Sequence, residues 1–513
     1  MSHAHSSRRV EPKTTPGDQS HLVTNGESPK RCLAIPIQSQ PPKSPCPDLL
    51  LNNLTPTDFQ LHQIRKSIQG ADEDIRRLQD AIDQLSTQIG ALQSFVERHR
   101  GVASAVRRLP SEILFEIFTH SLNTNRSSFH PKNALTDIIR VCARWRAVAL
   151  ASPLLWRHFV FDSELSSGKK AKVLQKTSLQ LQWSGQTPLS VQFLGNLFEV
   201  DLLGTLLAVS SRWQSATLRL PTGYYDRLFT SRVDFTILKE LTLKFEYSLC
   251  IGDATVFVSS LPSLVDLTLH MGFNDIPCGF KSIWAQLLEC TLVQCNFKDI
   301  LPILPLFSTE TRLSIRGCDS RDRDLAPVQL ATSILSQLAI PTLLLDSWYD
   351  KCFTDFLGAV AAPRLKTFVV REPHHSPRLL QFITTFLGNS SCTLTHLALR
   401  KFTSLPDLLT LLKLPQTRHI FALDIDLMFI PYIPIIDALA KHDIVSNLRS
   451  LTLRNSESVG DAGVLALHAS RRPTLQQLWL QRRTNELPLS QTALQALKSD
   501  GLEVVIFEQL DYW

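Results

Sequence analysis

Hydrophobic residues recur at alternating steps of three and four positions along residues 61–96. When Leu61 is placed at position a of a heptad, positions a and d are filled by Leu61, Ile64, Ile68, Ala71, Ile75, Leu78, Ile82, Leu85, Ile89, Leu92 and Val96. Ile or Val at a with Leu at d favours a parallel two-stranded coiled coil. The pattern predicts a heptad helix within residues 54–100, and a homodimer through residues 61–96 is one candidate assembly. The e and g positions are mostly uncharged, so packing against another helix or against the rest of the chain is the alternative.

Residues 1–53 have no comparable pattern. They are rich in proline, serine and polar residues, and they contain the cluster "QPPKSPCPD", which suits neither a helix nor a strand. A segment of this composition buries too little apolar surface to fold. We therefore expect a disordered tail over residues 1–53.

Two shorter amphipathic segments lie within residues 101–162. The first, "LPSEILFEIF", begins at Leu109, and Pro110 suits the first turn of a helix because its missing N–H has no partner to lose there. An apolar stripe at helical spacing follows at Ile113, Leu114, Ile117 and Phe118. In the second segment, apolar residues recur at steps of three and four, and Pro153 follows the last of them: Leu135, Ile138, Cys142, Trp145 and Ala149. The pattern predicts two short helices joined by a polar gap.

The rest of the chain repeats an x-Leu-x-Leu pattern that has an apolar residue three positions upstream. Clear copies are "LKELTL", "LVDLTL", "LTHLAL", "LRSLTL" and "LQQLWL", and weaker copies lie between them. Their central apolar positions are 243, 269, 292, 315, 345, 370, 399, 425, 453, 480 and 507. A period of about 20–29 residues is typical of leucine-rich repeats. The intervals read mostly as helices, so residues 221–513 are expected to form a β/α solenoid, with residues 163–220 as a linker and N-terminal cap.

In such strands the leucines point into the core and the residues between them point to the concave face. Arginine and tryptophan at such positions are the types that dominate binding hot spots. The candidate target-binding residues are Arg371, Arg400, Asp424, Asp426, Arg454 and Trp479. The alternative for each is a solvated polar face. The arginines would suit an acidic or phosphorylated target segment.

Composition narrows the classes of function. The chain is 44% hydrophobic and 19% charged, a composition typical of globular proteins. Its net charge is +6, and the basic residues are scattered along the sequence, which argues against a nucleic-acid-binding surface. One of the most apolar runs, Leu427–Ile436, is too short to span a membrane and contains two prolines. The 10 cysteines form no Cys-x-x-Cys pair, so reduced cysteines and a cytoplasmic or nuclear location are expected. The sequence contains no nucleotide-binding, hydrolase or metal motif, so we expect neither an enzyme nor a cofactor.

The order "LPSEILFEIF", then "VCARWR", then "PLLW" resembles the F-box, the module by which substrate receptors dock on the Skp-type adaptor of cullin-RING (SCF) ubiquitin ligases. A heptad helix leading into "RRLPSEIL", followed by "WRHFVFD" and "SRWQSATLRL", is similar to the large F-box families of mushroom-forming (agaricomycete) fungi. Together these features cover residues 55–220. The gap from Ser121 to Asn133 is longer and more polar than a minimal F-box needs.

This resemblance implies a fold class, a function and a set of contacts. The fold class is α/β, with an N-terminal heptad helix and an all-α F-box hairpin followed by an irregular leucine-rich-repeat solenoid. The implied function is that of a substrate-recognition subunit, in which the F-box docks the adaptor and through it the cullin, and the solenoid binds an unknown protein target. The alternative is a non-catalytic scaffold without a cullin. The implied adaptor-binding residues are Leu109, Pro110, Ile113, Leu114, Ile117, Val141, Cys142, Trp145 and Trp156.

Overall fold

The computed structural model divides the chain into two compact units, Met1–Arg108 and Leu109–Trp513. The residues that the structure describes are 42–122, 134–161, 170–194, 200–245, 253–272, 275–317, 336–346, 350–371, 379–402, 404–427, 432–441, 444–454, 459–482 and 489–508.

The first unit is dominated by one long helix, α1 (Asp58–Ala103). Thr57 caps this helix in a capping box, because the Gln60 N–H donates to Thr57 Oγ1 and the Thr57 N–H donates to Gln60 Oε1 at 3.0 Å. The helix begins four residues later than the predicted range 54–100, and it ends three residues beyond it. Its a and d side chains from Ile75 to Val96 are mostly exposed in the single chain. Two 3-10 helices flank it, η1 (Pro47–Leu50) and η2 (Ala105–Arg108).

The expected disordered tail falls largely outside the described residues, which begin at residue 42. Within the remainder of that segment, η1 forms and Cys46 is buried.

The second unit begins with a small helical module. Its helices are α2 (Ser111–Ser121), α3 (Ala134–Val141), α4 (Ala143–Leu150) and the 3-10 helix η3 (Pro153–Trp156). Its own buried cluster consists of Leu114, Phe118, Ile138, Ala149, Leu155 and Trp156. The gap from Ser121 to Asn133 lies mostly outside the described residues.

The second of the two expected helices is in fact two helices. Cys142 has an extended backbone (φ −160°, ψ 169°), and its sulfur accepts a hydrogen bond from the Trp145 N–H at 3.4 Å. This is the arrangement of an N-cap residue, which sits outside the helix that it caps. The expectation of a continuous helix through Cys142 was therefore wrong, because a cap at that position ends α3 and starts α4.

Fourteen strands of the described residues form one sheet in which every pair of neighbours is parallel. In order across the sheet they are β1 (His158–Phe161), β2 (Leu189–Phe193), β3 (Trp213–Leu218), β4 (Glu240–Lys244), β5 (Asp266–His270), β6 (Glu289–Val293), β7 (Arg312–Arg316), β9 (Thr342–Asp346), β11 (Thr367–Arg371), β12 (His396–Phe402), β13 (Ala422–Leu427), β14 (Ser450–Arg454), β15 (Gln477–Arg482) and β16 (Glu503–Glu508). A separate short pair joins β8 (Ser336–Gln337) and β10 (Val360–Ala361). The sheet begins at β1, before residue 221.

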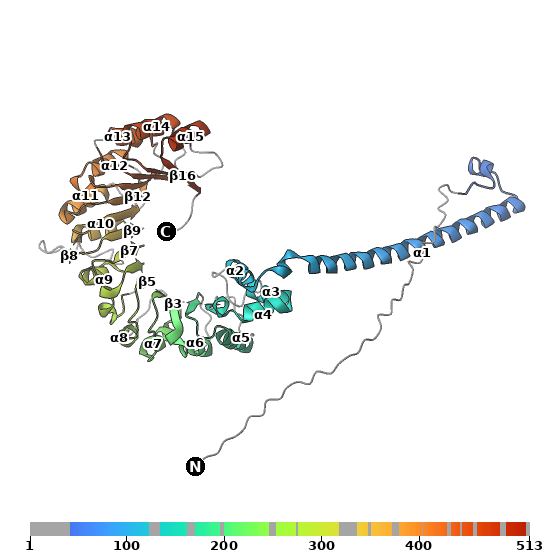
Figure 1. Cartoon of the computed structure of the whole chain (residues 1–513), viewed down its shortest axis with the longest axis horizontal. Helices are drawn as coiled ribbons and strands as arrows, with labels where there is room; N and C mark the ends of the chain where they lie inside the picture. Colours follow the sequence, from blue (N-terminus) through green and yellow to red (C-terminus); the bar gives the residue numbers. More distant parts are fainter. Residues whose placement is uncertain are drawn as a thin grey trace, which may run out of the picture. The chain divides into compact units, whose positions relative to one another are not determined.

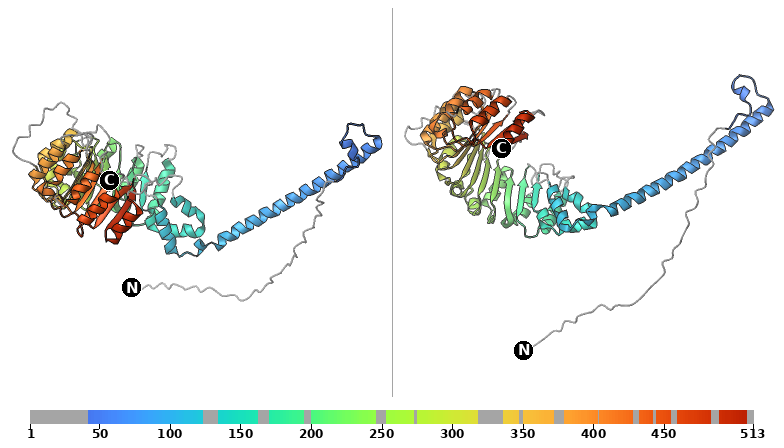
Figure 2. Two further views of the ribbon diagram at one scale, coloured as in Figure 1. Left: turned by 90° about the horizontal axis from the view of Figure 1, so that it is seen from above. Right: turned by 45° about the horizontal axis from the view of Figure 1, so that its top comes forward.

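Helices connect the strands on one side of this sheet. They are α5 (Lys170–Trp183), α6 (Val200–Leu207), α7 (Thr222–Thr230), α8 (Thr255–Ser259), α9 (Phe297–Ile300), α10 (Asp350–Ala359), α11 (Leu379–Ser390), α12 (Leu405–Leu412), α13 (Ile433–Ala440), α14 (Asp461–Ser470) and α15 (Gln491–Ser499). The 3-10 helices are η5 (Ser210–Arg212), η6 (Phe280–Ser282), η7 (Trp284–Gln286), η8 (Leu301–Leu306) and η9 (Pro415–Thr417). The sheet is curved, with the strands forming the inner, concave layer and the helices forming the outer layer (Figure 1). Figure 2 shows the same two layers from other directions.

The repeated leucines predict the strand register. Leu243 pairs in register with Leu269, and the same row continues through Leu292, Ile315, Leu345, Val370, Leu399, Ile425, Leu453 and Leu480. All of these side chains are buried in one continuous core. Cys290 and Cys295 also lie in it. The last predicted core position, Phe507 on β16, was wrong by one residue. Leu480 pairs in register with Ile506, whereas Phe507 pairs with Gln481 on the opposite face of the sheet.

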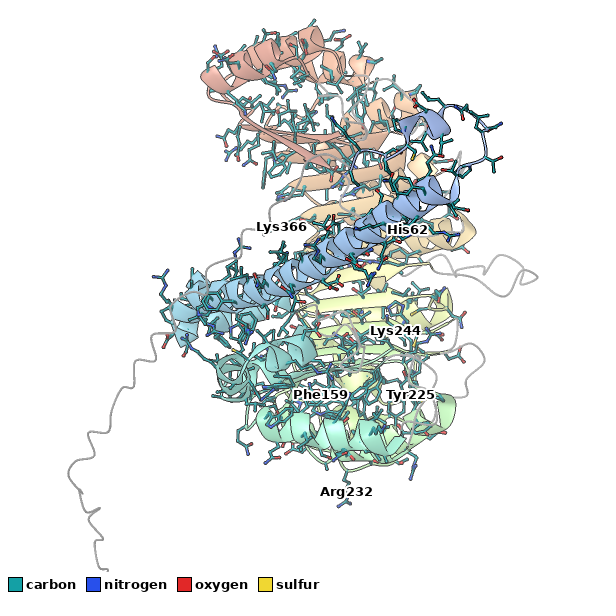
Figure 3. All side chains as sticks on the ribbon, turned by 90° about the vertical axis from the view of Figure 1, so that its right-hand side faces the viewer. His62, Phe159, Tyr225, Arg232, Lys244 and Lys366 are labelled. Carbon is teal, nitrogen blue, oxygen red and sulfur yellow. The ribbon has the colours of Figure 1, made fainter. Side chains whose placement is uncertain are left out.

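Two buried tyrosines tie neighbouring strands together in the same way. The Tyr225 hydroxyl lies 2.8 Å from the Leu218 carbonyl oxygen and 2.9 Å from that of Lys244, so it bridges the ends of β3 and β4. Figure 3 shows Tyr225 close to Lys244 at this end of the strands. Tyr432 makes the equivalent contacts to the carbonyls of Ile425 and Arg454. These bonds satisfy carbonyl groups where the parallel ladder ends.

Candidate functional site

The helical module exposes only some of the residues expected to contact an adaptor. Ile113 and Ile117 are 45% and 44% exposed, and Val141 is 59% exposed. Pro110 and Cys142 are exposed as well. Ile113 and Ile117 are one helical turn apart on α2, so they share one face of the helix. Exposed apolar side chains in this number on a small module are typical of a surface that a partner covers.

The other expected residues hold the module together. Leu114 and Trp156 belong to its buried cluster, while Leu109 and Trp145 are half-buried against it. The Trp145 ring packs against Phe118 with centroids 5.0 Å apart. Arg144 donates from Nη2 to the Leu109 carbonyl oxygen, which ties the start of α2 to α4. Leu114, Trp145 and Trp156 therefore position the exposed residues.

Leu154 is an exposed apolar residue that the sequence reasoning did not select. Its side chain is 47% exposed, whereas Leu155 next to it is buried. The signal was present in "PLLW", but which of two adjacent leucines faces outward depends on how η3 packs against the cluster.

Trp156 also connects the module to the sheet. Its Nε1–H donates to the Ala149 carbonyl oxygen at 2.8 Å, and its ring packs against Trp183 of α5 with centroids 4.6 Å apart. Gln180, also on α5, donates from Nε2 to the carbonyl oxygens of Trp156 at 3.1 Å and His158 at 2.8 Å. Burial and the neighbouring Arg157 charge lower the pKa of His158 to about 4. The junction is thus a packed contact in which the His158 ring is uncharged at neutral pH.

Residues 106–162 match the family model described as F-box-like. The matched range contains α2, α3, α4, η3 and β1. The comparison with curated proteins gives no match for the chain. An F-box-like domain indicates in general a substrate-adaptor role in an SCF ligase, and such domains generally bind Skp-type adaptors. Typical F-box proteins are non-catalytic adaptors.

The concave face carries the second group of candidate residues, and three of them form one ion-pair cluster. Arg400 on β12 donates from Nη2 to Asp424 Oδ2 at 2.9 Å. Arg454 on β14 donates from Nε to Asp424 Oδ1 at 2.9 Å and from Nη2 to Oδ2 at 3.0 Å. All three side chains are about four-fifths buried. Burial lowers the pKa of Arg400, and the Asp424 charge opposes this shift.

An aromatic pair adjoins this cluster. Phe507 lies with its ring centroid 6.4 Å from that of Trp479, and the Arg454 guanidinium carbon lies 5.6 Å from the centroid of the Phe507 ring. Phe507 was missed because the repeat pattern placed it in the core. The apolar residues Val504 and Ile506 occupy alternate positions of this strand, which could have assigned Phe507, next to Ile506, to the opposite, concave face.

The remaining candidates lie on the same face and are also matched by opposite charges. Arg371 on β11 donates from Nη1 to Asp346 Oδ2 at 3.1 Å. Asp426 pairs in register with Arg454 across β13 and β14. The three arginines and three aspartates balance one another in charge. The face of β9–β14 is therefore nearly neutral.

The part of the chain that the structure describes contains no group of three or more His, Cys, Asp and Glu side chains that could hold a metal ion. In the same residues no helix is both long enough and apolar enough to cross a membrane.

Proposed function

We propose that the chain is the substrate-recognition subunit of an SCF-type ubiquitin ligase. Its F-box-like module would dock a Skp-type adaptor, and through it the cullin. The observation that carries this proposal is the division of α2 into a buried side, with Leu114 and Phe118, and an exposed apolar side, with Ile113 and Ile117. The predicted adaptor contacts are then the exposed residues Pro110, Ile113, Ile117, Val141 and Cys142. The packed residues that hold them in position are Leu109, Leu114, Trp145 and Trp156.

The experiment that tests the proposal is capture of a purified Skp-type adaptor and cullin by the full chain. We expect Ile113→Ala/Ile117→Ala to weaken adaptor capture at least tenfold, because truncating hot-spot side chains typically costs about 2 kcal/mol or more. The matched control is Val256→Ala/Ile433→Ala, which truncates two similarly exposed β-branched residues on α8 and α13. Equal capture by wild type and the Ile113/Ile117 variant would contradict the docking surface.

The sheet region would be a leucine-rich-repeat solenoid whose concave face binds the target. A ligase of this kind gains rate by holding the target close to the ubiquitin-conjugating enzyme in a fixed orientation. The packed junction of Trp156, Gln180 and Trp183 supports this role, because it ties the module to the first strand and helix of the sheet. Candidate target contacts are Arg371, Arg400, Asp424, Asp426, Arg454 and Trp479, together with Phe507. The pairing of these arginines with carboxylates leaves little net positive charge, so the proposal does not include an acidic or phosphorylated target.

The assembly would include a homodimer through residues 61–96. The exposed apolar seam of α1 supports it, because a single copy leaves Ile75, Ile82 and Ile89 in water. The same seam favours the second candidate function, a scaffold without a cullin that organises partners through α1 and the sheet. The same proposal places the protein in the cytoplasm or the nucleus. It also relates the chain to the F-box families of agaricomycete fungi.

A further inference from the structure

The first residues of three neighbouring strands on the concave face are acidic. Glu240 on β4 pairs in register with Asp266 on β5, and Asp266 pairs with Glu289 on β6. Adjacent strands lie about 4.8 Å apart, so the three carboxylates form a row about 10 Å long. Their strand neighbours Leu241, Leu267 and Cys290 are buried, which places the carboxylates on the opposite, concave side.

This row is unfavourable for the isolated chain. Like charges directly opposite one another on adjacent strands are destabilising. Burial, followed by the charges of Glu289 and Glu240, raises the pKa of Asp266 to about 6. Among the described residues, the ion pair that reaches this row joins Arg312 to Glu289 at 3.3 Å, and both side chains are more than half exposed. An exposed pair of that kind is weak. Most of the negative charge of the row thus stays uncompensated.

Apart from Arg312, which begins β7 in register with Glu289, positive charge lies at the other ends of the same group of strands. Lys244 ends β4 and Arg316 ends β7. Figure 3 shows Lys244 at the carboxyl ends of the strands, whereas Lys366, which directly precedes β11, lies at the amino ends. His270 ends β5, and burial with the charges of Lys244 and Arg316 lowers its pKa to about 4, so it is neutral at pH 7. Four residue steps separate the acidic row from these cations, which is about 13 Å.

Short side chains fill most of the space between the two charged ends, and at β7 the Arg316 Nε–H reaches back to donate to Ser314 Oγ at 3.0 Å. Thr242, Thr268, Thr291 and Ser314 lie side by side in register across β4–β7. We call this surface the β4–β7 face: the acidic row of Glu240, Asp266 and Glu289, the cations Lys244 and Arg316, and the four hydroxyl residues between them. It differs from the β9–β14 surface, where opposite charges meet in direct ion pairs.

We propose that the β4–β7 face binds an α-helix of a protein partner that lies across the strands, with Lys or Arg along the flank facing the acidic row and Asp or Glu along the other flank. An α-helix with its side chains is about 10–12 Å in diameter, which fits between charged ends about 13 Å apart. Residues at i, i+4 and i+7 rise about 6 Å and 10.5 Å along a helix, close to the spacing of three successive strands. The short hydroxyl side chains let the helix approach the sheet. As a description of the ligase target, this inference rests on the proposed function.

The test measures binding of a defined probe to the full chain. The probe is a fluorescent alanine-based helical peptide with Lys at i, i+4 and i+7 on one flank and Glu on the opposite flank. Fluorescence anisotropy at low salt should show saturable binding. The variant Glu240→Gln/Asp266→Asn/Glu289→Gln should bind about tenfold more weakly, since each lost charge pair contributes a few tenths to 1 kcal/mol.

Two controls separate this surface from general charge attraction. The variant Asp226→Asn/Glu310→Gln/Asp437→Asn changes the net charge equally at exposed positions off the strands and should bind as wild type does. A peptide of the same composition with Lys and Glu mixed on every flank should bind more weakly than the probe. Absence of probe binding overturns the proposal. So does equal binding by the triple strand variant, or equal binding of the mixed peptide.

Adaptor capture is measured on the same proteins. Retained adaptor capture with lost probe binding in the triple strand variant is the expected result. If wild type binds the probe but captures no adaptor, the proposed ligase function fails while the β4–β7 face stands. If it captures the adaptor but does not bind the probe, only the present inference fails.

Discussion

Trp156 and Trp183 pack with their ring centroids 4.6 Å apart, although Trp156 closes the F-box-like module and Trp183 ends the first helix that covers the sheet. We expect this contact to make the module and the sheet unfold together. We expect Trp183→Ala to lower the free energy of unfolding by about 2 kcal/mol, less than a fully buried tryptophan loses. Calorimetry should then resolve a separate early transition of the module. Trp479→Ala, a half-buried tryptophan far along the sheet, should keep a single transition. Coincident melting of module and sheet in Trp183→Ala would contradict the coupling.

Arg471 is fully buried and should be a major stabilising residue. It donates from Nε, Nη1 and Nη2 to the carbonyl oxygens of Leu439, Val445 and Ile444, each at 2.7 Å. Arg471→Met leaves three buried carbonyl groups without these donors, which should cost about 3 kcal/mol or more. Arg472→Met changes the adjacent, half-exposed arginine and should cost less than about 1 kcal/mol. Urea unfolding of both variants compares them directly. Similar midpoints would show that the buried guanidinium contributes little.

Asp266 should make stability depend on pH in an unusual direction. Its pKa is raised from 3.8 to about 6 by burial and by Glu289 and Glu240. Between these values the folded protein binds more protons than the unfolded chain, so stability falls as pH rises from about 4 to about 6. Asp266→Asn should remove this loss and raise stability above pH 6 by about 0.5 kcal/mol. Thermal melts at pH 4.5 and 7.5 measure it.

Asp253→Asn gives the matched control with the opposite sign. Hydrogen bonds from the Thr255 hydroxyl and N–H lower the pKa of Asp253, so its stabilising effect is present at neutral pH and is lost on acidification. We expect this variant to melt at lower temperature than wild type at pH 7.5. A Tm for Asp266→Asn below that of wild type at pH 7.5 would mean that the carboxylate row is not repulsive.

Asp424 should be the key residue of the β9–β14 ion pairs. Asp424→Asn leaves the largely but not fully buried Arg400 and Arg454 without their shared carboxylate and should cost about 2 kcal/mol, below the roughly 3–5 kcal/mol of fully buried pairs. Asp346→Asn breaks the more exposed pair with Arg371 and should cost about 0.5 kcal/mol. Chemical unfolding of both variants tests this order, and a reversed order would show that the two arginines find other partners.

The seam of α1 should govern the oligomeric state. Ile75→Gln/Ile82→Gln places polar groups at two a positions, and sedimentation equilibrium should show a shift toward monomer relative to wild type. Asp80→Gln/Thr87→Gln changes two f positions of the same heptads and should leave the association unchanged. A wild-type chain that is monomeric at micromolar concentration would exclude the homodimer.

The sequence determined the features that depend on local periodicity. The heptad spacing predicted α1. The leucine spacing predicted the position and register of the strands from β4 to β15 in the large sheet, because burial of alternate side chains fixes both the face and the register of a strand. It located β16 as well, but one residue out of register. The F-box-like pattern identified the helical module, which the match over residues 106–162 supports.

Only the tertiary structure decided which side chains meet. Arg400, Asp424 and Arg454 are 24 and 30 positions apart in their pairs, and only the parallel register brings their charged groups to 2.9 Å. The split at Cys142 depends on a single capping bond, and the outward turn of Phe507 on a one-residue shift of register. The acidic row of Glu240, Asp266 and Glu289 has the same origin. Each residue alone is an ordinary polar position, and the row exists because the strands align three such positions side by side.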